Sequence, residues 1–177
     1  SDILSSNLNA LLDKAEDPEK LIRMMVREME DVLIEVKASC AGAMATKRRI
    51  QRELEDTRAR ASAWQSKAKL AVEKGRDNLA REALLERRRY VERAEALEEE
   101  LDQVENLVNQ YHVDITQLEE KLDAVRERER VMVQRHIHAQ RKLRAQHEVR
   151  RLDTSNAMAR FEAFEQHLDR MEAEADL

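Results

Sequence analysis

The sequence predicts an all-α protein built around a long antiparallel coiled-coil hairpin. Its 177 residues include only two Gly and one Pro, too few breakers for the many turns of a sandwich, a barrel or a doubly wound sheet. Aromatic residues make up 3% of the chain, which excludes a large aromatic core. Apolar residues nevertheless recur with alternating spacings of three and four over most of the sequence, a pattern typical of coiled-coil helices.

Charge and cysteine content narrow the function classes. The formal net charge of −5 comes from 32 basic and 37 acidic residues, a near balance that argues against a dedicated nucleic-acid binder. The single cysteine, Cys40, cannot form an intramolecular disulfide, which fits a reducing compartment. No apolar run approaches the ~20 residues of a membrane span, and residues 1–15 lack the pattern of a secretory signal. We therefore expect a cytoplasmic protein or one bound peripherally to a membrane.

The first long helix is expected to begin at Asp17, where Pro18 suits the first helical position. Its seam is interrupted by polar residues only at Lys47 and Thr57. One line of this seam is Ile22, Met29, Val36, Ala43, Ile50, Thr57, Trp64 and Ala71, and the parallel line includes Val26, Leu33, Cys40, Lys47, Leu54 and Ala68.

The turn of the hairpin is expected near residues 74–78. Gly75 can adopt the left-handed conformation that ends a helix, and Asp77 or Asn78 can cap the next one. The seam then restarts and weakens only near Glu129 and His136. Its main line is Ala83, Tyr90, Leu97, Val104, Tyr111, Leu118, Val125 and Met132. Two long seams joined by a short turn predict an antiparallel hairpin over residues 17–151 whose second arm overshoots the first.

Amphipathic helices are expected at both ends of this hairpin. Residues 1–16 form a short helix with one apolar face and a face rich in serine and asparagine. Its apolar residues are Ile3, Leu4, Leu8, Leu11 and Leu12. They suit either insertion into a membrane interface or packing on a protein partner.

A break at residues 151–156 is expected to precede a further helix within residues 152–177. The apolar stripe of this helix is Ala157, Phe161, Phe164, Leu168, Met171 and Ala175. A helix of this length is not stable alone in water, so the stripe predicts contact with a groove on the same hairpin or on a neighbour. These features predict a homo-oligomer.

Catalytic, cofactor and metal sites are not indicated. None of the five histidines has a Glu three residues before it, as a di-iron helical bundle requires. The chain lacks a glycine-rich phosphate loop and a G-x-S-x-G nucleophile motif. Six Lys or Arg between Arg135 and Arg151 form a basic stretch, which suits a solvated face, pairing with acidic residues of a neighbour, lipid headgroups or nucleic acid.

Several stretches resemble the family that phage shock protein A shares with the vesicle-inducing protein of plastids. They are residues 9–18 (NALLDKAEDP), 28–31 (EMED), 78–84 (NLAREAL), 157–164 (AMARFEAF) and 171–175 (MEAEA). The family belongs to the bacterial branch of the ESCRT-III superfamily, so the resemblance implies an ESCRT-III-like fold with this order of helices. It also implies about seven further residues before Ser1, and a linker and last helix after Leu177.

By this resemblance, the protein is expected to polymerise into rods or rings on the cytoplasmic face of the bacterial inner membrane. It would bind anionic lipids through the front helix and protect the membrane under stress. The alternative is a regulatory module whose hairpin inhibits an AAA+ transcriptional activator, and a purely cytoskeletal coiled coil is a third hypothesis.

The resemblance also implies assembly residues. Lys37 occupies the position of a basic residue that pairs with acids of other subunits, with Glu172 as its expected partner and Glu119 or Glu120 as a second. Arg81 and Leu84 lie in the stretch at the hairpin tip, where the family's last helix docks. Phe161, Phe164 and Leu168 are expected to form an assembly stripe.

Overall fold

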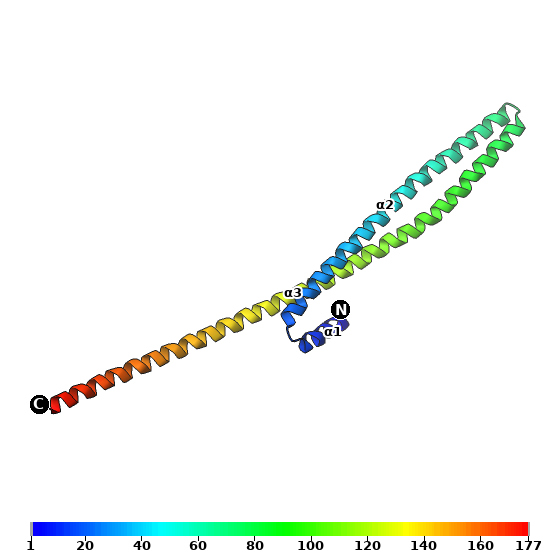
Figure 1. The fold of residues 1–177 in the computed structure, drawn as a ribbon. Helices are drawn as coiled ribbons and strands as arrows, with labels where there is room; N and C mark the ends of the chain where they lie inside the picture. Colours follow the sequence, from blue (N-terminus) through cyan, green and yellow to red (C-terminus); the bar gives the residue numbers. More distant parts are fainter. Residues whose placement is uncertain (1, 177) are drawn as a thin grey trace.

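The computed structural model describes the backbone of residues 2–176 and the side chains of residues 7–176. It contains three helices, α1 (Asp2–Lys14), α2 (Pro18–Glu73) and α3 (Asp77–Ala175), and residues 2–176 include no strand. Figure 1 shows α2 and the first part of α3 side by side as a long antiparallel hairpin, with α1 folded back near its open end. The rest of α3 extends away from the hairpin as a single straight helix. The predicted all-α hairpin is confirmed.

The start of α2 follows from a short run of capping residues. Asp17 is the N-cap, and its side chain accepts a hydrogen bond of 3.2 Å from the backbone nitrogen of Lys20. Pro18 occupies the first turn, where a missing backbone N–H has no consequence. The acidic side chain of Glu19 follows in the same turn, where it complements the positive end of the helix dipole.

The turn between α2 and α3 is a Schellman motif centred on Gly75. Gly75 has a φ of 71°, a conformation that side chains with a Cβ rarely adopt. The Arg76 nitrogen donates to the Ala71 oxygen at 2.8 Å, and the Gly75 nitrogen donates to the Val72 oxygen at 3.0 Å. The expected side-chain cap of α3 is wrong, because Arg76 is the N-cap and makes no such bond, while Asp77 lies in the first turn.

The hairpin is held together by apolar side chains along the predicted seam. In its middle, Ile50 and Leu54 of α2 pack with Ala94 and Leu97 of α3, and Leu97 is 0% exposed. Val104 borders this cluster, and Trp64, Tyr111 and Leu118 are half-buried. Thr57 is buried in the seam, and the burial of its hydroxyl is tolerated because the hydroxyl donates a hydrogen bond to the Glu53 carbonyl at 2.7 Å.

Ion pairs between α2 and α3 flank this seam. Arg93 pairs with Glu53 at 2.9 Å, Arg126 pairs with Glu30 at 3.0 Å, and Arg58 contacts Glu98. All six side chains are at least two-fifths exposed, so each pair contributes little to stability. Their opposite charges nevertheless favour this register over one that slides like charges together.

The expected break at residues 151–156 is wrong. α3 continues without interruption to Ala175. Thr154 does not cap a new helix; its hydroxyl donates to the Arg150 carbonyl one turn earlier, at 2.9 Å. Residues 151–156 contain no Gly or Pro, and Ser, Thr and Asn are tolerated inside a helix when their side chains bond back in this way. A helical boundary between residues 151 and 152 is therefore absent.

Candidate membrane-binding and assembly site

The front helix packs against the open end of the hairpin. Leu8 and Leu12 of α1 are only 8% and 4% exposed. They form one apolar cluster with residues from both arms of the hairpin, which we call the base cluster. Its buried members are Leu8, Leu12, Ile22, Val26, Leu122 and Val125, and Leu21, Met25, Met29, Leu33 and Met132 border it.

This packing changes the interpretation of the front-helix residues predicted to bind membranes. Leu8 and Leu12 contact the hairpin rather than solvent, so they match the protein-packing alternative in this conformation. Leu11, which is 55% exposed, lies on the open side of the helix. The side chains of Ile3 and Leu4 lie outside the described residues. Sequence reasoning missed the receiving surface because Leu122 and Val125 read as ordinary seam residues.

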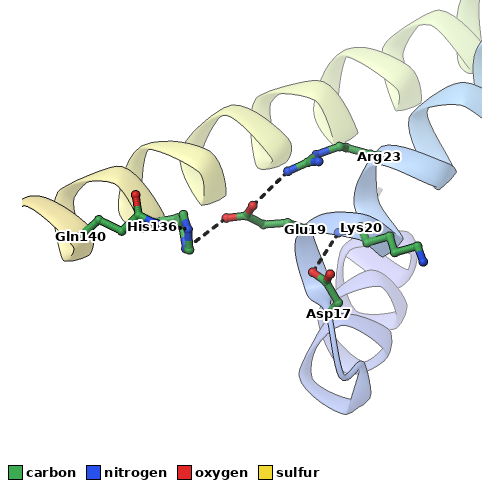
Figure 2. A network of polar contacts seen from close by, with 6 residues as sticks. All are labelled: Asp17, Glu19, Lys20, Arg23, His136 and Gln140. Atoms are coloured by element: carbon green, nitrogen blue, oxygen red, sulfur yellow. Dashed lines mark hydrogen bonds and ion pairs between the residues drawn. The ribbon is translucent and has the colours of Figure 1, made fainter.

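A polar network joins α2 to α3 at the open end of the hairpin, beside α1. Figure 2 shows Glu19 between Arg23 of its own helix and His136 of α3. The Glu19 carboxylate lies 3.1 Å from the Arg23 guanidinium and 3.6 Å from His136 Nδ1, and Gln140 lies 3.0 Å from His136 Nε2. This network connects the first turn of α2 to α3 close to the point at which α3 leaves the hairpin.

Beyond the hairpin, α3 continues as a long exposed segment, residues 134–176, which we call the tail. Every residue of the tail is exposed. The predicted apolar stripe of the tail is exposed to solvent. Phe161 is 62% exposed, and Phe164, Leu168 and Met171 are between 43% and 59% exposed. The basic stretch of residues 135–151 and Glu172 also lie in the tail. So large an unpaired apolar stripe on a water-exposed helix indicates a contact surface.

The hairpin tip, where the resemblance implies a docking surface, carries a groove that neither Arg81 nor Leu84 lines. It has a volume of about 610 Å³ and lies between the last turns of α2 and the first turns of α3. Its walls include Trp64, Leu70, Leu79 and Leu85, and the Lys67 ammonium lies 4.3 Å from the centre of the Trp64 ring. The signal available in the sequence was the cluster of leucines off the seam, next to the turn.

The predicted assembly residues occupy different places. Arg81 and Leu84 are exposed near the tip. Lys37 and Glu119 lie opposite each other in the hairpin, with the Lys37 ammonium 3.3 Å from the Glu119 carboxylate of the same chain. Glu172 is exposed near the end of α3, in the tail. The structure thus brings together only one of the expected pairs, and within a single molecule.

The chemistry of these surfaces is packing and charge pairing. Within residues 2–176, no helix is long and apolar enough to cross a bilayer, and no group of three potential metal ligands comes together. Among the side chains of residues 7–176, Glu127 is the one carboxyl with a clearly shifted pKa, which is lowered by the hydrogen bond from Arg130 on the same exposed face. That is a local helix pair rather than a reactive site.

The fold and its surfaces define a class: a coiled-coil hairpin that presents amphipathic helical segments at its open end. The chain belongs to the PspA/IM30 family, whose sequence model matches residues 1–177. The resemblance inferred from the five sequence stretches is thereby confirmed.

Curated relatives extend this match across plastids and bacteria. The chain is 34% identical to "Membrane-associated protein Vipp1" of Nostoc punctiforme over 98% of its length and 67% of the relative's. It is 31% identical to the chloroplastic protein of that name in Arabidopsis thaliana, over 99% of its length and 53% of the relative's. It is 38% identical to "Phage shock protein A homolog" of Bacillus subtilis, over 59% of its length and 43% of the relative's. The chain thus spans between 43% and 67% of the length of these three relatives.

Proposed function

We propose that this chain is part of a self-assembling peripheral membrane protein that maintains and remodels a bacterial inner membrane under stress. It would act on the cytoplasmic face, bind anionic lipids, and polymerise into rods or rings. The observation that carries the proposal is that one long hairpin bears both an amphipathic helix docked at its open end and a long exposed tail. The names of the relatives, which describe membrane-associated and phage shock proteins, support it.

Membrane binding would use α1 as an interfacial helix. Leu8, Leu11 and Leu12 lie within little more than one turn, so together they can enter the boundary between headgroups and acyl chains. Burial of each leucine contributes ~1.5–3 kcal/mol before ordering costs. Because Leu8 and Leu12 belong to the base cluster, α1 must swing away from the hairpin before its whole apolar face reaches the bilayer.

Assembly would use the surfaces that stay exposed when α1 detaches. The tail stripe of Phe161, Phe164 and Leu168 is one of these, and the tip residues Arg81 and Leu84 form a second. Charged residues such as Lys37 and Glu172 would set the register between subunits once the apolar contacts form. Growth of the polymer on a lipid surface then imposes curvature or covers a damaged patch.

A matched pair of exposed substitutions tests the membrane step. Leu11→Asp places a charge on the open side of α1 without disturbing the base cluster, and Met24→Asp does the same to an equally exposed residue of α2. We expect Leu11→Asp to lose cosedimentation with vesicles of phosphatidylglycerol and phosphatidylcholine, and Met24→Asp to retain it. Electron microscopy of the same samples reports rods, rings or tubulated vesicles. Equal binding by both variants would contradict insertion through α1.

The tip groove favours a second function, inhibition of an AAA+ transcriptional activator. An apolar groove at the end of a rigid hairpin is suited to hold a partner's surface loop or helix. Leu79→Ser and Leu85→Ser together would abolish inhibition of the activator's ATPase while vesicle binding is preserved. Full inhibition by this double variant would exclude the groove as the regulatory surface.

A further inference from the structure

The tail stripe has the heptad arrangement of a two-stranded coiled coil, although no second strand is present. Alternating steps of four and three connect its apolar residues, so they occupy the a and d positions of successive heptads. The a positions are Phe161, Leu168 and Ala175, and the d positions are Ala157, Phe164 and Met171. All six residues are exposed on a helix that is already formed.

The residues beside this stripe carry opposite charges on its two sides. Glu165 and Glu172 occupy e positions, next to d, while Arg160, His167 and, at the end of the stripe, Glu174 occupy g positions, next to a. None of the ion pairs found among residues 7–176 uses Arg160, Glu165 or Glu172, so these charges remain free for another partner.

Charge placement distinguishes the two ways in which a pair of such helices can pack. In a parallel pair, each g side chain faces the e side chain of the following heptad on the other helix. Arg160 would then face Glu165 of the second copy, and His167 would face Glu172 of the second copy. In an antiparallel pair, e faces e and g faces g. The glutamates at e of the two copies would then meet, and only the Arg160–Glu174 contacts at g would join opposite charges. The pattern therefore favours the parallel arrangement.

We propose that the tail of one molecule packs in parallel, and in register, against the tail of a second copy of this chain. The interface would be the stripe from Ala157 to Ala175, with two Phe layers at its centre and Arg160–Glu165 pairs on both edges. This inference rests on the proposed self-assembly and specifies its geometry. It places two hairpins side by side at the same end of the paired tails.

Other occupants fit this surface less well. The hairpin of the same chain cannot cover the tail, because α3 carries the tail straight away from it (Figure 1). An anionic membrane would be repelled by the acidic flank of Glu165 and Glu172, which borders the apolar residues directly. A second tail supplies both the apolar stripe and the opposite charges.

Disulfide trapping in the 177-residue protein tests the orientation. Cys40 is first replaced by Ala, and single cysteines are then introduced as Ala157→Cys, Ala175→Cys or Gln166→Cys. Gln166 lies at an outward f position on the same tail and serves as the matched control. A parallel pair brings residue 157 of both copies together, whereas an antiparallel pair separates them by roughly 27 Å, since a helix rises 1.5 Å per residue.

Mild oxidation is expected to yield covalent dimers of Ala157→Cys and of Ala175→Cys, but not of Gln166→Cys. Mixed, differently tagged Ala157→Cys and Ala175→Cys proteins are expected to give no dimer linking the two tags. Efficient formation of that mixed dimer would overturn the parallel arrangement. Rods or rings in electron micrographs without any dimer through residue 157 or 175 would also overturn it, while leaving the proposed assembly intact.

Charge reversal provides a second readout that does not depend on cysteine geometry alone. In the paired tails, Glu165→Arg places an arginine opposite Arg160 at both edges. We expect about a fivefold lower yield of trapped Ala157→Cys dimer, because two exposed ion pairs together contribute a free energy of about that size. Adding Arg160→Glu exchanges the two charges and should restore the yield. Failure of the exchange to restore a lowered yield would refute the Arg160–Glu165 contact.

Discussion

Replacing Leu122 by Ala tests whether docking of α1 and insertion into a membrane compete for the same side chains. Leu122 belongs to α3, is 3% exposed, and contributes to the base cluster in which Leu8 and Leu12 are buried. The substitution leaves the sequence of α1 unchanged, and it weakens both the surface on which α1 lies and the adjoining seam between α2 and α3. If the two states compete, the variant binds vesicles more tightly than the unmodified chain.

The magnitude follows from the carbons removed. Leu122→Ala deletes three buried carbon groups, worth about 2.4 kcal/mol in all at ~0.8 kcal/mol each. Leu122 shares the base cluster with residues of both α1 and α2, so we assign about half of this, ~1.2 kcal/mol, to the docking of α1. Since 1.4 kcal/mol corresponds to a factor of ten, the ratio of docked to open α1 should fall about sevenfold. The apparent affinity for vesicles should rise by a similar factor while the docked state predominates.

The assay is cosedimentation with anionic vesicles over a range of lipid concentrations, and Leu97→Ala is the control. Leu97 is the same residue type on the same helix and is 0% exposed, but its cluster contains no residue of α1. Both variants should destabilise the hairpin by ~2–5 kcal/mol in urea unfolding. Only Leu122→Ala should bind vesicles more tightly. An unchanged or reduced affinity of Leu122→Ala relative to Leu97→Ala would refute the competition.

Three further substitutions test the local structure. Gly75→Ala should lower the free energy of unfolding by about 1 kcal/mol in urea titrations, purely through its φ of 71°, because an added Cβ would meet no atom within 4 Å. Asp17→Ala removes the cap of α2 and should lower the same free energy by about 1 kcal/mol, whereas Asp17→Asn should retain most of it. Lys37→Ala should change stability by less than about 0.5 kcal/mol, because its pair with Glu119 is exposed. A loss of assembly in Lys37→Ala, measured by sedimentation velocity, would show that this residue acts between molecules.

The hairpin was predictable because its information is local and repeated. The alternation of three and four was enough to place Ile50 and Leu97 in the seam, and the single glycine near the middle of the chain placed the turn at Gly75. The error at residues 151–156 has an equally local cause. Ser, Thr and Asn serve both as helix caps and as tolerated interior residues, and only the bond from Thr154 to Arg150 shows which role applies.

The candidate site was less predictable because its state depends on contacts between distant segments. The sequence identified α1 as amphipathic and the tail stripe as a contact surface, and it named the residues of each. It contained no signal that Leu8 and Leu12 would join one apolar cluster with Leu122 and Val125, more than a hundred residues away. It also did not reveal the groove at the tip, which forms only when the ends of α2 and α3 lie side by side.

By itself, the sequence determined that this protein is a long helical hairpin with amphipathic ends, because helical periodicity, capping residues and scarce breakers act over short distances. The tertiary structure alone decided which apolar surfaces are covered. The leucines of α1 are buried because they join an apolar cluster from both arms at the open end of the hairpin. The tail is exposed because α3 extends beyond the end of α2. Whether an apolar face is buried depends on which helices come together. An amphipathic sequence predicts only that its apolar face will be covered, and does not identify the covering element.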